Sequence, residues 1–125
     1  MNPQVHRIFS ELDSHLSPSD KQWIVETTEE NFTRLHYGLG LVIRNKFIYA
    51  SEGSVGNELG LIFGNPDGVS SLLSKLYWWH LLKIEPTREM LDLAFERHLI
   101  IWSEADKEAG MRLLEEQRPL NESGV

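Results

Sequence analysis

The stretch NPDGVSSLLSKLYWWHLLKI, residues 65–84, decides the fold. Its Asn-Pro start is typical of a helix beginning, because asparagine caps the first turn and proline at the first helical position gives up no hydrogen bond. The part LYWWHLL, residues 76–82, is apolar around nearly the whole helix. Such a helix is usually buried in a small protein, so we predict that it is the central helix. The alternative is an exposed aromatic face, with Trp78 as an interface anchor.

Two helices are predicted before this segment. Residues 2–16 place apolar side chains at spacings of three and four behind a capping Asn2, which indicates an amphipathic helix. Residues 17–32 begin with Ser17 and carry an acidic residue three positions later, which is nearly a capping box. The side chains of this second helix that are predicted to face the core are Trp23 and Ile24.

Two more helices are predicted after the central segment. Residues 85–102 again show proline near a capping residue, which is either Glu85 or Thr87. Residues 103–117 read as a polar helix with a thin apolar stripe, which predicts packing at one edge of the molecule. The stripe consists of Ala105, Ala109, Met111 and Leu113 or Leu114, with Gly110 between them.

The run HYGLGLVIRNKF, residues 36–47, contains two glycines two positions apart. A phosphate-binding loop is excluded, because the third glycine and the strand-to-helix context are missing. Apolar residues at spacings of three and four predict instead one buried helix over residues 31–49. The stripe comprises Phe32, Leu35, Leu39, Val42, Ile43 and Phe47.

Helix geometry would place His36, Gly40 and Arg44 above one another on one side of that helix. Gly40 would then leave a notch with an imidazole at one end and a guanidinium at the other. The notch is either a ligand site or a packing site. In the packing interpretation another helix backbone fills it, Arg44 pairs with a carboxylate such as Asp67, and His36 donates to a carbonyl.

Residues 50–68 hold five glycines in nineteen positions and are predicted to form a central loop, with at most a short helical turn near residues 57–63. Residues 118–125 show no periodicity and are predicted to form a flexible tail. The length fits one domain over residues 1–117. We therefore expect a single compact all-α domain of five or six helices.

The motif around the glycine pair resembles a family of small bacterial and phage domains of unknown function. In that family a His-aromatic-Gly-Leu-Gly run is followed after two residues by Ile-Arg-Asn, and residues 36–45 match it. A later family turn, His-Pro-Asp-Asp-Met-Ser, is matched only at Pro66, Asp67 and Ser70, and an aromatic helix follows. The resemblance covers residues 32–84 and implies no activity. It groups His36, Arg44, Asn45 and Asp67 as candidate binding residues, with His80 on the aromatic helix.

Few catalytic patterns are present. The chain has no cysteine, which excludes disulfides and thiolate chemistry, and its five histidines lack metal-ligand spacing, so we expect neither a metal nor a cofactor. No serine lies in a nucleophile elbow. A catalytic constellation would have to be assembled in three dimensions from His36, Arg44, Asp67 and His80. Enzymatic activity is thus left open, with the balance against it.

The net charge of −7 is spread unevenly: −3 over residues 1–35, +1 over residues 36–84 and −5 over residues 85–125. Nucleic acid binding is disfavoured, because basic side chains supply most of that affinity. No segment approaches the roughly 20 apolar residues of a membrane span, and no signal peptide is seen, so a cytoplasmic location is expected.

These observations favour a small acidic protein-binding module, an inhibitor or immunity-type protein that neutralises a toxin or defence enzyme by covering its basic active face. The alternatives are a small enzyme or ligand-binding domain that uses the notch of His36, Gly40 and Arg44, and a homo-oligomer joined through its tryptophans.

Overall fold

The computed structural model describes residues 1–35, 38–49, 54–99 and 103–116. Every regular element among these residues is a helix, so the predicted all-α class is confirmed. Seven α-helices, one 3₁₀ helix and one π-helix are found in the described ranges, more than the five or six helices predicted. None of these helices combines the length and apolar character needed to cross a membrane.

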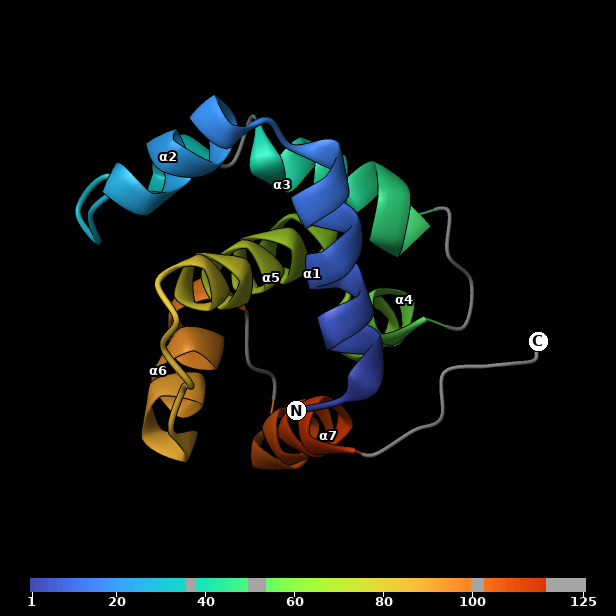
Figure 1. Cartoon of the computed structure of the whole chain (residues 1–125). Helices are drawn as coiled ribbons and strands as arrows, with labels where there is room; N and C mark the ends of the chain where they lie inside the picture. Colours follow the sequence, from blue (N-terminus) through green and yellow to red (C-terminus); the bar gives the residue numbers. More distant parts are fainter. Residues whose placement is uncertain (36–37, 50–53, 100–102, 117–125) are drawn as a thin grey trace.

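The central helix is α5 (Pro66–Leu81), as predicted. Figure 1 shows it in the middle of the molecule, with the other helices arranged around it. Eleven of its sixteen residues are buried, because apolar side chains point in nearly every direction around its axis. Trp78 is 9% exposed and Trp79 is 6% exposed, so the aromatic part of α5 is core and not an open face.

Helix starts follow the predicted caps. In α1 (Pro3–His15) the Asn2 side chain accepts from the backbone N–H of Gln4, and in α2 (Pro18–Glu26) Ser17 and Asp20 complete a capping box. Of the two caps considered for α6 (Arg88–His98), Thr87 is the one used. These predictions succeeded because capping depends on residues within one turn.

The prediction that Trp23 faces the core is wrong. Ile24 is buried, whereas Trp23 is 47% exposed. Neighbouring positions on a helix point about 100° apart, so a short helix that buries one narrow face cannot bury both.

The predicted single helix over residues 31–49 is also wrong. The segment contains the 3₁₀ helix η1 (Phe32–Leu35), the short helix α3 (Leu39–Ile43) and the π-helix η2 (Arg44–Tyr49). Five of the six stripe residues are nevertheless buried, and only Val42 is partly exposed. Spacings of three and four are compatible with 3₁₀, α and π turns alike, so the stripe predicted burial but not one continuous helix.

The predicted glycine-rich loop over residues 50–68 is replaced in large part by helix. The helix α4 (Val55–Phe63) is capped by Ser54 and ends at Gly64 with φ +61°, a left-handed conformation that glycine adopts without strain. A Cβ at Gly56 would lie 2.6 Å from the carbonyl oxygen of Phe47. Gly56 therefore allows α4 to approach the backbone of η2 closely, and glycine here serves contact, not flexibility.

The last described helix, α7 (Glu104–Glu115), packs beside α4 and next to the N-terminus (Figure 1). Asn2 donates from its backbone N–H to the Leu114 carbonyl and from Nδ2 to the Leu113 carbonyl, over 2.5 and 2.9 Å. These bonds join the two ends of the helical domain. Of the predicted apolar stripe, Met111, Leu113 and Leu114 are buried, whereas Ala105 is exposed. The predicted tail, residues 118–125, lies outside the described residues.

Candidate functional site

Arg44 and Asp67 are brought together, as the packing interpretation of the notch proposed. Arg44 is 8% exposed, and its Nε lies 3.4 Å from Asp67 Oδ1. Its Nη1 donates to Ser70 Oγ over 3.0 Å, and that hydroxyl donates to the Asp67 carbonyl over 2.8 Å. The guanidinium thus binds the first turn of α5 through a carboxylate and a hydroxyl. The Asp67 side chain itself is 68% exposed, so only the Arg44 side of this ion pair is buried.

The space above Gly40 is occupied from within the site. A Cβ at Gly40 would lie 3.4 Å from Arg44 Nη1, 3.5 Å from the Leu35 carbonyl oxygen and 3.6 Å from Ser70 Oγ. These are ordinary contact distances, so the gap accepts one methyl group and little more. Of the other predicted binding residues here, Asn45 is exposed on η2 and His36 lies outside the described residues.

His80 belongs to a different part of α5. It lies ten residues beyond Ser70, about 15 Å along the helix. Its Nε2 is 3.3 Å from Asp13 Oδ2, and its ring stacks on Phe9 at 4.7 Å between centroids. Tyr77 donates to the same Asp13 over 2.7 Å, and burial, followed by this hydrogen bond, raises the Tyr77 pKa above its usual range. The described structure therefore separates His80 from Arg44 and Asp67.

A buried lysine was missed in the sequence. Lys75 is the only charged residue within residues 69–79 and is 3% exposed. Its ammonium contacts the Glu29 carboxylate and lies 4.7 Å from the ring centroids of Phe32 and Trp78 and 5.5 Å from that of Trp79. A lone charge in an otherwise uncharged run was the available signal, but its partner Glu29 lies 46 positions away.

Two buried polar atoms near Lys75 lack a hydrogen-bond partner among the residues that the structure describes: Trp78 Nε1 and His98 Nε2. Burial, reinforced by the cations of Lys75 and Arg97 and opposed by Glu29, lowers the His98 pKa to about 4. His98 is therefore neutral at pH 7 and adds no positive charge beside Lys75.

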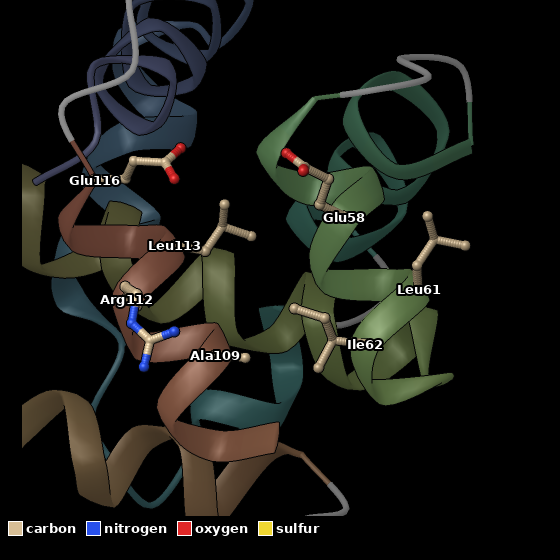
Figure 2. Close-up of a pocket in the computed structure, with 7 residues that line it drawn as sticks. All are labelled: Glu58, Leu61, Ile62, Ala109, Arg112, Leu113 and Glu116. Atoms are coloured by element: carbon tan, nitrogen blue, oxygen red, sulfur yellow. The ribbon is translucent and has the colours of Figure 1, made fainter. Parts of the chain in front are cut away.

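An apolar groove lies between α4 and α7 (Figure 2). It has a volume of about 400 Å³. Leu61, 78% exposed, and Ile62 come from α4, while Leu113 lies opposite on α7. Glu58 and Glu116 extend toward one another from the two sides. This groove was not predicted from the sequence, because the residues of α4 were expected to form a loop. The remaining lining residues are Ala109 and Arg112.

A second groove, of about 500 Å³, lies between α5 and α6. Lys75 and Trp79 form its floor on α5, and Glu29 borders it. We call it the Lys75 groove. Its α6 side consists of Met90, Leu93, Ala94, Glu96 and Arg97.

Within the described ranges, no group of three or more histidine, aspartate or glutamate side chains is placed to hold a metal ion. A third hollow, of about 310 Å³, lies between α2 and α3 and is lined by Trp23, Ile24, Leu39 and Val42 among others.

Comparison with known proteins places the chain in a family. No curated protein sequence and no solved structure is significantly similar to it. A family model described as a domain of unknown function, DUF6794, matches residues 4–81. The matched range runs from α1 to the end of α5, includes Arg44, Asp67 and Lys75, and stops before α6 and α7. The expected membership in an uncharacterised domain family is confirmed: the chain belongs to the DUF6794 family of domains of unknown function.

Proposed function

We propose that this protein is a cytoplasmic protein-binding module that receives an apolar helix of a basic partner in the groove between α4 and α7. The observation that carries the proposal is Leu61, which is 78% exposed on the wall of an apolar groove. Leu61 adjoins Ile62 and Leu113 along this groove, and a contiguous exposed apolar surface is where a protein tends to bind a partner. Its biological role would be that of an inhibitor or immunity-type protein, which neutralises a toxin or defence enzyme by covering its basic active face.

The groove has the form of a helix-binding site. On α4, Glu58, Leu61 and Ile62 share one face at spacings of three and four, and Ala109, Arg112 and Leu113 do so on α7. Two such faces can take the apolar stripe of a third helix between them. Glu58 and Glu116 at the border, together with the net charge of −7, favour basic residues flanking that stripe.

The proposal is tested by capture from the native host with matched variants. Leu61→Asp places a charge in the groove and should abolish retention of the partner. Leu93→Asp is the control, because Leu93 is similarly exposed, at 66%, but lies on α6 in the other groove. A partner that binds both variants as well as the parent protein would disprove binding between α4 and α7.

The salt dependence of the association rate distinguishes electrostatic steering of the partner from apolar contact in the groove. If the acidic surface guides a basic partner, the association rate should fall by about tenfold or more between low salt and about 0.5 M, because salt screens exposed charges. An unchanged rate would remove electrostatic steering and leave only the apolar groove.

The alternative function, a ligand-binding domain or small enzyme at the notch of His36, Gly40 and Arg44, has weaker support. Arg44 is already engaged by Asp67 and Ser70, and the gap at Gly40 is the size of one methyl group. A ligand anion would have to displace Asp67, and no further observation favours that exchange.

A further inference from the structure

Lys75 cannot be hydrated where it lies. It is 3% exposed, and aromatic rings surround its ammonium on several sides. Cation–π contacts stabilise a desolvated ammonium only in part, so a buried lysine needs an anion to remain charged. In this structure the Glu29 carboxylate supplies the negative charge.

Glu29 is far more exposed to solvent than Lys75. Its side chain is 50% exposed, and it lies in the turn between α2 and η1, not within a helix. The ion pair thus joins a fixed buried cation to a carboxylate that already faces water. Releasing Glu29 to solvent costs little, provided that another anion takes its place on Lys75.

The Lys75 groove provides room for such an anion and for an apolar group attached to it. Its volume of about 500 Å³ lies within the range of small-molecule sites, roughly 300 to 1,000 Å³. Trp79, whose ring centroid lies 5.5 Å from the ammonium, and three apolar residues of α6 form its apolar lining: Met90, Leu93 and Ala94. Two charged side chains of α6 also line the groove. Arg97 is a second cation, and Glu96 is a carboxylate whose charge is offset by Lys107 at 2.7 Å. A groove with apolar walls and a buried cation suits a molecule with one anionic end and an apolar body.

We propose that the Lys75 groove binds a small organic carboxylate, whose anionic group takes the place of the Glu29 carboxylate on Lys75. The exchange preserves charge, because one carboxylate replaces another on the same ammonium. The ligand gains by burying its apolar part against Trp79 and α6. Glu29 acts as the internal occupant that keeps Lys75 paired when the ligand is absent. This inference does not depend on the helix-binding groove between α4 and α7.

The test uses hexanoate as the probe, with calorimetric titration and thermal melting of the full chain. Glu29→Gln removes the internal competitor, so hexanoate should bind this variant at least about tenfold more tightly than the parent protein. The bound carboxylate should also raise the melting temperature of Glu29→Gln by at least about 5 °C at a hundredfold excess over Kd. Lys75→Met keeps the apolar length of the side chain and should lose binding.

Controls separate this site from general effects. Hexanamide and hexylamine carry the same chain without the anion and should not bind. Asp67→Asn removes the carboxylate that pairs with the other buried cation, Arg44. Hexanoate should not raise the melting temperature of this variant. Binding by Lys75→Met, equal binding of hexanamide, or no binding to either the parent protein or Glu29→Gln would overturn the proposal. If Glu29→Gln does not fold alone, recovery of its folded signal on adding hexanoate, but not hexanamide, supports the proposal, and failure to recover overturns it.

Discussion

Two buried cations differ in how they are held: Arg44 of η2, which packs on α5, and Lys75, which is part of α5. The guanidinium of Arg44 binds a carboxylate and a hydroxyl in the first turn of α5, and it occupies the space over Gly40. Lys75 in the middle of the helix has a carboxylate and aromatic rings, and it borders a groove of about 500 Å³. Each carboxylate partner is at least half exposed, so the difference lies in what else surrounds the cation.

The comparison separates a structural junction from a candidate site. Arg44 joins η2 to α5 and leaves little space beside it, so its contacts stabilise the packing of these two elements. Lys75 depends on a single carboxylate from a turn and has open volume next to it, which is the arrangement expected where a ligand exchanges with an internal group.

The largest effect is expected from Glu29→Gln. It leaves a buried ammonium without a carboxylate, and the free energy of unfolding should fall by about 3 kcal/mol. Asp67→Asn is the matched change at Arg44 and should cost only about 1 kcal/mol, because Ser70 still accepts from the guanidinium and an asparagine oxygen can still accept from Nε. Urea unfolding of both variants measures the difference, and equal losses would contradict the distinction between the two cations.

Acid should lower the free energy of unfolding through protonation of His98, which lies near Lys75. Burial, aided by the Lys75 and Arg97 cations, lowers its folded pKa to about 4, below the usual value of 6.5. The unfolded chain therefore binds more protons between these values, and stability falls as the pH drops from about 6.5 to about 4. The contribution reaches up to about 3 kcal/mol. In urea unfolding at pH 7 and pH 4.5, His98→Gln should lose less stability on acidification than the parent protein. The same loss in both would exclude His98 as the source.

Local features of the fold were predictable from the sequence. Caps at Asn2, Ser17 and Asn65 involve only the next few residues, and the apolar composition of α5 was sufficient to predict its burial. The segment from η1 to η2 was predicted as buried but not as three kinds of helix, because its apolar spacings do not distinguish them. Gly56 was interpreted as a loop residue, since a sequence does not show that a backbone elsewhere approaches it.

The candidate site was less predictable, because its contacts join distant parts of the chain. The pairing of Arg44 with Asp67, which was one of two interpretations of the notch, is present, but the exposure of Asp67 could not be derived from spacing. Lys75 pairs with Glu29 across 46 positions, and its groove needs α6 as the opposite wall. Such pairs of distant residues arise from tertiary packing, and the only sign of this one in the sequence is a single charged residue in an otherwise uncharged run.

Arg44→Gln should have a moderate effect. The exposed Asp67 is released to water, so no buried charge is left unpaired, and the main loss is the hydrogen bond to Ser70 with some packing. We expect the free energy of unfolding to fall by about 1 to 2 kcal/mol. A loss above about 3 kcal/mol, the size typical of a broken buried pair, would show that Arg44 is as dependent on its carboxylate as Lys75.

Gly40→Ala should have the smallest effect and the opposite sign. Its new methyl group would meet Arg44, Leu35 and Ser70 at 3.4 to 3.6 Å, which are ordinary contact distances, and alanine favours the helical conformation of α3 by up to about 1 kcal/mol. The free energy of unfolding should therefore stay equal or rise slightly. Gly56→Ala is the matched control in α4: its methyl group would lie 2.6 Å from the Phe47 carbonyl oxygen, and the resulting shift of α4 away from η2 should cost about 1 to 3 kcal/mol. If Gly40→Ala were as destabilising as Gly56→Ala, the guanidinium of Arg44 would have no freedom to adjust, and the junction would be tighter than its distances indicate.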